Sequence, residues 1–463
     1  MSPASSLSIW QKNKLLIKSF CIGMLVLVLL IPTFFIMFLV TDREYRRGEV
    51  VQEVSSKWAE AQTITGPFLA IPYYQEEKAA NNSIATVKKY MYLLPEELQI
   101  NGSLQPLIKH RSIFKVPVYN SSLTLTGTFK ITKPEKLAVS ITMLHFDEAV
   151  VCMGIADFKG IGENLMMKWN GTASVFESGV PGASWLPDGL SNPVKLTADE
   201  LLTGQNTFAI DLTLKGSEKF YVCPFGSTTT MHLKSERPNP AFDGKYLPDT
   251  STVTSKGFSA TWKVLHFNRN FPSSFTSINQ EVIAQSAFGL KLLQPVDGYG
   301  QTMRSVKYAV LLIALTFFVY FFFEIYYRQH VHPLQYILIG FALVIFYTLL
   351  LSISEYLAFS QAYAIAASAT VLLIGWYTKS IFKRWPVVLL FTFIHSALYL
   401  FIYVLIQLQD DALLFGSIGL FVLLAVIMYF SRKVKWERKK RVLLIVNKTW
   451  KACIPAAQAF LYF

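Results

Sequence analysis

The sequence predicts a mixed fold: a six-helix transmembrane domain with a large all-β domain, sandwich- or barrel-like, inserted between its first and second helices. Three observations predict this class. One uncharged apolar run lies near the N-terminus at 20–40, the long central region has the period-two pattern of strands, and further apolar runs follow residue 306. A run of about 20 apolar residues is long enough to cross the ~30 Å hydrocarbon core of a bilayer.

The composition is that of a membrane protein. Of the 463 residues, 52% are apolar, 14% aromatic and only 16% charged, against about 25% charged in an average soluble protein. The net charge is +13, and seven basic residues lie between 432 and 441, directly after the last apolar run. Such a position is typical of a topology signal that also touches anionic lipid. The charge therefore indicates membrane lipids as partners, and no nucleic acid.

The first apolar run is interpreted as an uncleaved anchor helix. Three lysines precede it, and it continues into Asp42, Arg43 and Glu44 without the small residues of a signal-peptide cleavage site. Five more membrane helices are expected at 307–327, 334–353, 359–377, 386–406 and 412–430.

The connections between these helices alternate between basic and non-basic. Arg328 follows the second helix and Lys383 lies between the fourth and fifth, whereas the connections at 354–356 and 407–411 have no Lys or Arg. By the positive-inside rule both termini are cytoplasmic. The expected domains are therefore a cytoplasmic N-terminus (1–19), the anchor (20–40), a periplasmic β-rich domain (41–306), a five-helix bundle (307–430) and a basic cytoplasmic tail (431–463).

The region outside the membrane begins with a helical pattern and continues with a strand pattern. Val51, Val54, Trp58 and Ala61 have helical spacing, which predicts that an amphipathic helix continues the anchor and ends before Gly66-Pro67. Period-two alternation follows at 122–129, 136–143, 208–214 and 229–233. Turn signals are Asn101-Gly102, Asn120-Ser121, Asn170-Gly171, Pro187-Asp188-Gly189 and Asp243-Gly244.

Four cysteines are too few for a disulfide scaffold. Cys21 lies in the anchor and Cys453 in the tail, whereas Cys152 and Cys223 fall in the external domain. A bridge between these two and a pair of separate buried thiols both fit the sequence.

The candidate ligand-binding residues are polar side chains of the membrane half: His395, Glu355 and Ser352. His395 lies near the middle of the fifth helix, where a charge is costly, so it should be neutral and face other helices. A hydrogen bond between helices and a proton or ligand role are its two interpretations. Glu355, beside Ser352, is expected to line a pocket open to the outside, and Glu324 to be an interfacial residue at a helix end.

No catalytic constellation is present. His330 and His332 lack the partners of a metal site, and there is no zinc-protease, nucleophile-elbow, phosphate-loop or dinucleotide motif. The sequence therefore predicts no catalytic residue, no metal and no cofactor, and favours a protein that is not an enzyme.

Several stretches in one order resemble the CreD-type family of bacterial inner-membrane proteins, described as envelope-integrity proteins. They are SSKWAEAQTITGP (55–67), ADFKGI (156–161), PNPAFDG (238–244), LLQPVDGY (292–299), HPLQY (332–336), LLLSISE (349–355) and ALLFGS (412–417). The resemblance covers about 15–436 and departs after Trp436. It implies an inner-membrane location, a role in envelope integrity or stress, and a loose association with tolerance to envelope-directed toxins and antibiotics, and it supplies no catalytic residues.

Two classes of function remain open. In the first, the protein is a non-enzymatic envelope component whose β domain binds a periplasmic protein or envelope polymer. In the second, the bundle binds a lipid or small amphiphile near His395 and Glu355, as a carrier or membrane enzyme would. The lack of a catalytic constellation favours the first.

Overall fold

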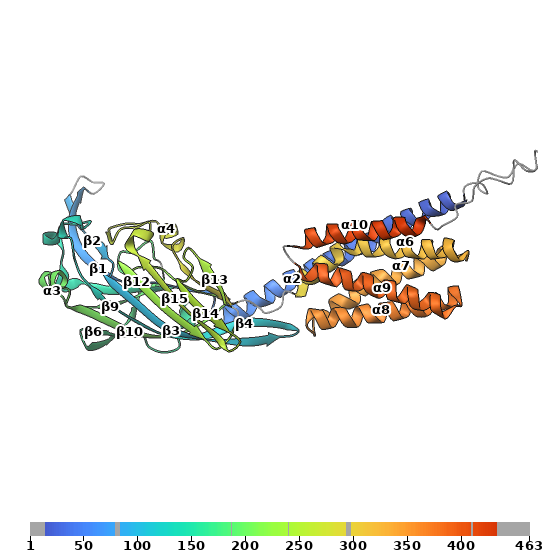
Figure 1. Cartoon of the computed structure of the whole chain (residues 1–463). Helices are drawn as coiled ribbons and strands as arrows, with labels where there is room; N and C mark the ends of the chain where they lie inside the picture. The colour runs from blue at the N-terminus through green and yellow to red at the C-terminus, as the bar shows by residue number, and fades with distance from the viewer. Residues whose placement is uncertain are drawn as a thin grey trace, which may run out of the picture. The chain divides into compact units, whose positions relative to one another are not determined.

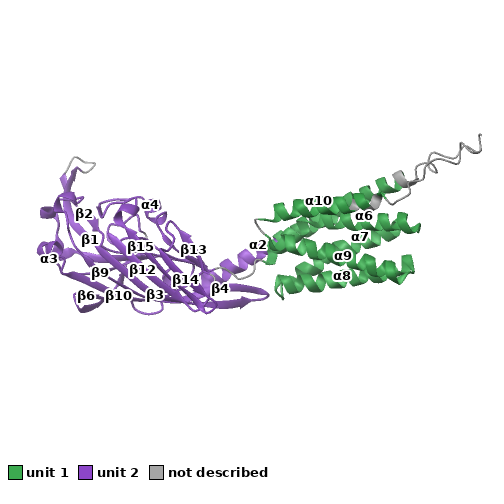
Figure 2. Ribbon diagram, in the orientation of Figure 1, with its two compact units in different colours: residues 1–41, 298–463 green, residues 42–297 purple. Residues whose placement is uncertain are grey.

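The computed structural model describes residues 14–78, 84–186, 188–238, 240–292, 298–408 and 411–432. The chain forms two compact units (Figures 1 and 2): a helical unit of Met1–Thr41 with Gly298–Phe463, and a β unit of Asp42–Asp297. Cys453 and, apart from its first two residues, the expected tail lie outside the described residues.

The N-terminal anchor and the amphipathic stripe after it belong to one helix, α2, which spans Lys14–Trp58 and contains Pro32. This confirms that the helix continues beyond the apolar run and ends before Gly66. In the β unit, two lysine side chains pack on Trp58, the last residue of α2. The Nζ atoms of Lys109 and Lys215 lie 4.4 Å and 5.1 Å from the centre of the Trp58 ring, a cation–π arrangement.

The predicted helices after residue 306 are all present. One further helix, α5, was not predicted, because its residues are too polar for an apolar run. It begins where the β domain was expected to continue, and it buries Thr302, Ser305 and Val306 within the helical unit. The helices after the β unit are α5 (Gly298–Lys307), α6 (Ala309–Tyr327), α7 (Pro333–Ser354), α8 (Phe359–Phe382), α9 (Trp385–Gln407) and α10 (Ala412–Ser431).

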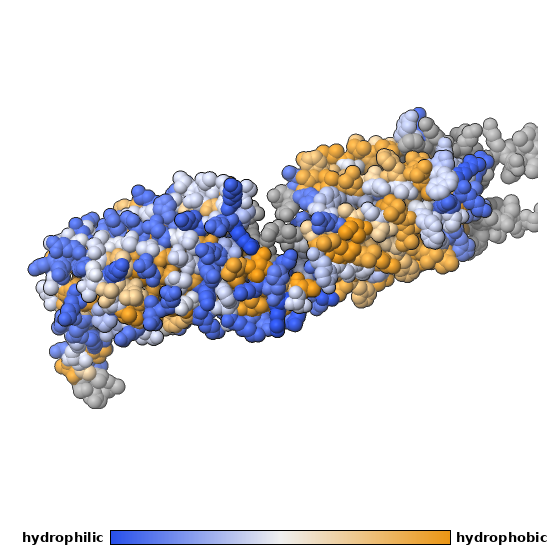
Figure 3. Space-filling model, turned by 90° about the horizontal axis from the view of Figure 1, so that it is seen from below, coloured by the Kyte–Doolittle hydropathy of each residue, from blue (hydrophilic) through white to orange (hydrophobic). Residues whose placement is uncertain are grey.

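Among the described residues, five helices are long and apolar enough to cross a membrane: α2, α6, α7, α8 and α9. In α10, the segment Ala412–Val426 counts as a shorter apolar helix, below the length required of a membrane span. Large apolar side chains such as Trp376, Leu389 and Phe393 point outward, and apolar side chains cover much of the visible face of the helical unit (Figure 3). Such a surface suits lipid rather than water.

The β unit consists of two sheets that share one hydrophobic core, so of the two predicted architectures, sandwich and barrel, it has the sandwich. One sheet has the order β13-β17-β11-β1-β5-β9-β8, with β2 pairing to β1 and β16 to β2. The other has the order β14-β15-β12-β3-β4-β10-β6-β7. The first sheet contains β1 (Gln62–Lys78), β2 (Ile84–Leu93), β5 (Val150–Ile155), β8 (Glu177–Ser178), β9 (Gly189–Pro193), β11 (Lys219–Val222), β13 (Pro240–Gly244), β16 (Ser274–Phe275) and β17 (Phe288–Leu292). The second contains β3 (Glu97–Arg111), β4 (Phe114–Phe129), β6 (Met166–Trp169), β7 (Thr172–Val175), β10 (Asn206–Ser217), β12 (Thr228–Ser235), β14 (Thr250–Thr254) and β15 (Gly257–Leu265).

Three of the four alternating segments are strands, and one is not. The segments at 122–129, 208–214 and 229–233 lie in β4, β10 and β12. The segment at 136–143 forms 3-10 turns instead. Its alternate apolar side chains, including Leu137 and Ile141, still pack against the core, so the period-two pattern reports the buried face correctly but not the pairing of the backbone.

Some of the predicted turn signals form turns in the structure and others do not. Asn170 and Gly171 form the β6–β7 turn with positive φ at both positions, as expected. Asn101-Gly102 and Asn120-Ser121 lie inside strands instead, so these predictions were wrong. Asp243-Gly244 ends β13, where Gly244 has a φ of +98°. At Gly102 a Cβ would stand 2.3 Å from the Leu123 side chain, so the glycine serves close packing between β3 and β4 rather than a turn.

Candidate functional site

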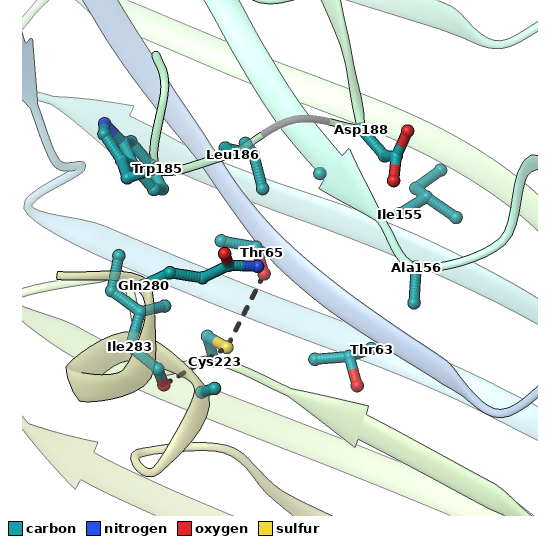
Figure 4. A pocket seen from close by; sticks show the side chains of 12 residues that line it. Thr63, Thr65, Ile155, Ala156, Trp185, Leu186, Asp188, Cys223, Gln280 and Ile283 are labelled. Carbon is teal, nitrogen blue, oxygen red and sulfur yellow. Dashed lines mark hydrogen bonds between the residues drawn. The ribbon is translucent and has the colours of Figure 1, made fainter.

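A cavity of about 270 Å³ lies in the β unit beside the point where β1 meets β5 and β11 (Figure 4). Two sheet strands, a loop and the short helix α4 (Gln280–Ala284) supply its walls. Its lining residues are Thr63, Thr65, Gly154, Ile155, Ala156, Trp185, Leu186, Asp188, Cys223, Gln280, Ile283 and Ala284. Parts of two stretches that carry the family resemblance, 55–67 and 156–161, thus meet at this cavity.

A β-bulge in β1 shapes the cavity. The register of β1 against β5 shifts between Thr65 and Phe68, and Gly66 has φ +114°, a conformation that favours glycine. A Cβ at Gly66 would lie 3.2 Å from the Cys152 carbonyl oxygen. Bulges of this kind redirect side chains and are frequent beside binding sites, and here Thr63 and Thr65 both line the cavity.

The cysteine beside the cavity is structural rather than reactive. Both thiols of the β unit are free, so the alternative with a bridge between Cys152 and Cys223 is not realised. The Cys223 thiol donates to the Ile283 carbonyl at 3.7 Å and lies 3.6 Å from the Thr65 hydroxyl. Burial raises its pKa to about 12, and burial also raises the pKa of Cys152. A thiol of this kind is a poor nucleophile at neutral pH.

The remaining lining chemistry suits binding. Thr63, Asp188 and Gln280 supply hydroxyl, carboxylate and amide groups, while Trp185 and Leu186 supply apolar surface. A mixture of apolar wall and few polar groups is typical of ligand pockets. Within the described ranges, no group of three or more His, Cys, Asp or Glu side chains could hold a metal ion.

Arg269 stabilises the backbone segment directly after Cys223 through hydrogen bonds. Its side chain is buried, Nη1 donates to the Phe225 carbonyl at 2.7 Å and the Pro224 carbonyl at 3.3 Å, and Nη2 donates to the Ser273 hydroxyl at 2.7 Å. The guanidinium also lies 5.0 Å from the centre of the Phe271 ring. Burial lowers the pKa of Arg269 to about 10. Its hydrogen bonds to two backbone carbonyls and a hydroxyl make this side chain a structural strut.

His395 is fully buried in α9, as predicted for a residue that faces other helices. Its ring stacks on Phe391 with centroids 5.3 Å apart and meets Tyr399 edge-on at 5.7 Å. Neither ring nitrogen has a hydrogen-bond partner among the described residues. The expected hydrogen bond between helices is therefore not formed there, and aromatic packing takes its place.

The structure does not bring the three predicted site residues together. Glu355 caps the C-terminal end of α7, is half-buried and accepts a hydrogen bond from Tyr299 at 3.4 Å. Ser352 is exposed on α7. His395 lies near the middle of α9, roughly 15 Å of helix from either end of it, so it cannot act with Glu355 as an acid–base pair.

Sequence reasoning missed a buried charged cluster. Glu324 was expected at the interface, but it is buried and forms an ion pair with Lys18 of α2. Tyr336 donates to Glu324 Oε2 at 2.9 Å, and Lys18 also donates to the Val331 carbonyl at 2.8 Å. The sequence does show a basic residue, Lys18, and an acidic one, Glu324, near the ends of two apolar runs. Because they are 306 positions apart, the sequence alone could not show that they form a pair.

Comparison with known proteins agrees with this architecture. A family model described as "Inner membrane protein CreD" matches residues 14–437. A protein of Escherichia coli (strain K12) described as "Inner membrane protein CreD" is 32% identical over 416 residues, which cover 89% of this chain and 91% of that protein. Together with the apolar helices, these matches identify a multi-pass protein of the inner membrane. The chain belongs to the CreD family of inner membrane proteins.

Proposed function

We propose that this protein is a non-enzymatic component of the cell envelope, with a role in envelope integrity or stress response, whose β unit binds a periplasmic protein or envelope polymer. In this proposal α2 and α6 to α10 are six membrane spans, the β unit is inserted between the first two, and both termini are cytoplasmic. The alternation of basic connections along the sequence supports this topology.

The observation that carries the proposal is the cavity beside the β1 bulge. At about 270 Å³ it matches one side chain or one small polar unit of a larger partner, rather than a whole cofactor. Asp188, Gln280 and Trp185 all line it (Figure 4) and offer a carboxylate, an amide and an aromatic ring. Because the nearby thiol is inert, these groups favour recognition over chemistry.

Photo-cross-linking in intact cells tests this role. A benzophenone side chain in place of Gln280, which lines the cavity, should give a discrete adduct with a periplasmic component. The same probe in place of the neighbouring Glu281, which is exposed but does not line the cavity, is the matched control. The adduct should disappear when Ala156→Trp fills the cavity. No adduct at either position, or equal adducts that ignore Ala156→Trp, would count against binding in the cavity.

A second candidate function follows from His395, whose buried nitrogens lack a partner among the described residues. Such groups in a membrane bundle often mark a ligand site, so the bundle would handle a lipid or small amphiphile. Native mass spectrometry of gently solubilised wild type, His395→Ala and Glu355→Ala tests it. A co-purifying amphiphile lost from either variant supports this function, and bound lipids that ignore both changes exclude these residues as its site.

A further inference from the structure

Helix α5 carries polar side chains into the end of the helical unit. It packs against α6, α7, α8 and α9, and Thr302 and Ser305 are fully buried while Lys307 is exposed. The helix therefore has one face turned to its neighbours and one turned away, although it is polar along most of its length.

Three residues on the inward side share an unusual property. The guanidinium atoms Nε and Nη2 of Arg304, the Gln301 Oε1 atom and the Ser305 hydroxyl are buried and have no hydrogen-bond partner among the described residues. Positions 301, 304 and 305 have the i, i+3, i+4 spacing that places side chains along one stripe of a helix. Two nitrogens of a cation, an amide oxygen and a hydroxyl thus lie along one stripe of α5 without partners among the described residues.

An anion is the ligand that these groups lack. A buried guanidinium is expensive unless an opposite charge and hydrogen bonds compensate it. Arg presents its N–H groups in a planar fork that matches the oxygens of phosphate or carboxylate. The Ser305 hydroxyl can donate to one remaining oxygen. The Gln301 side chain can donate to another when its terminal amide turns over, so that the NH2 group takes the place of the unpartnered Oε1 atom. Among the described residues, the ion pairs use other cations of the chain, such as Lys18, and leave Arg304 available.

We propose that Arg304, Ser305 and Gln301 form a binding site for a phosphate-class oxyanion, supplied by a lipid headgroup or by free phosphate. The site goes beyond partner binding by the β unit and does not depend on it. Arg304 pairs with two oxygens of the anion through Nε and Nη2, the Ser305 hydroxyl donates to a further one, and the Gln301 amide donates through its nitrogen in the turned-over orientation.

Binding to the purified full-length protein tests the site. Native mass spectrometry of protein titrated with phosphatidylglycerol measures binding of a lipid headgroup, and diacylglycerol, which has no phosphate, is the reference lipid. Competition by inorganic phosphate identifies a free-anion site. Arg304→Gln should weaken binding at least about tenfold, because it removes a charged hydrogen-bond donor. Lys307→Gln removes the same charge from the exposed face of the same helix and should change binding less than about twofold.

The proposal fails if both substitutions weaken binding equally, which would indicate general charge attraction, or if wild type prefers neither phosphatidylglycerol nor phosphate. Should Arg304→Gln fold poorly, Gln301→Glu takes its place, because it keeps Arg304 and adds a repelling carboxylate to the same stripe. Loss of binding in a folded Gln301→Glu protein supports the site, and unchanged binding overturns it. Suppression by inorganic phosphate assigns the site to the free anion, whereas binding of the lipid alone assigns it to a headgroup.

Discussion

Lys18 and Glu324 form an ion pair that joins α2 to α6 within the helical unit. Glu324 is buried, and Tyr336 of α7 and the Val331 carbonyl complete the cluster around the two charges. One acid thus connects the N-terminal helix with two helices from the other end of the chain. Removing one partner of a buried ion pair leaves the other charge uncompensated, which is costly.

Removing one charge of this pair should destabilise the helical unit. Glu324→Ala leaves Lys18 and the Tyr336 hydroxyl without their acceptor, so we expect a loss of about 3 kcal/mol. The control is Glu49→Ala, which breaks the exposed pair with Arg46 and should cost less than about 1 kcal/mol. Denaturation of the solubilised protein measures both. Equal losses would show that Glu324 is no more than a surface charge.

The helices and the class of the β unit could be predicted, because long apolar runs and alternation are local properties of the sequence. Local signals failed where long-range packing decides. Asn101-Gly102 has the composition of a turn, but the neighbouring strand β4 extends past it and Leu123 needs the space. Helix α5 was missed for a related reason, since its polar stripe is buried only because four other helices surround it.

The candidate site could be predicted only in part. His395 was expected to be buried and is, because a polar residue in the middle of an apolar run must face other helices. His395 lies near the middle of α9 and Glu355 at the end of α7, so the two residues lie at different depths of their helices. The cavity in the β unit was not predicted, because its walls come from β1, β5, the loop that contains Trp185, and α4, which are distant in sequence.

Arg269 should be essential for the stability of the β unit. Arg269→Met leaves the Pro224 and Phe225 carbonyls and the Ser273 hydroxyl without their donor, so we expect a loss of about 3 kcal/mol. Arg237 is exposed, and Arg237→Met should stay within about 0.5 kcal/mol. Urea unfolding followed by tryptophan fluorescence compares the two. A similar small effect for both would mean that the strut is dispensable.

The thiols of Cys152 and Cys223 should be protected from labelling reagents by burial, and they should not form a disulfide. Because burial raises the pKa of Cys152 and Cys223, a maleimide should label neither in the native protein. Both should react in denaturant without a reductant, since they are free. Mass spectrometry counts the labels. Labelling that requires a reductant would reveal a bridge and contradict the structure.

The β unit should lose stability at low pH through Asp243. Hydrogen bonds from Tyr221 and Lys291 lower the pKa of this carboxyl to about 2, from its ordinary 3.8. Since the folded state has the lower pKa, the stabilisation is complete above about pH 4 and is lost as the pH falls toward 2. Unfolding midpoints across this window should fall more steeply for wild type than for Asp243→Asn. If the midpoints of wild type and Asp243→Asn fall in parallel with pH, Asp243 is not the cause of the loss of stability at low pH.

The most direct test of the account is the side of the membrane on which the cavity opens. Gln280→Cys and Lys383→Cys, each in a chain with Cys21 and Cys453 replaced by serine, are exposed to a membrane-impermeant maleimide in spheroplasts whose inner membrane is intact. We expect position 280 to be labelled at once and position 383 only after permeabilisation. Labelling of position 383 but not 280 in intact spheroplasts would place the β unit in the cytoplasm and contradict the proposed periplasmic binding.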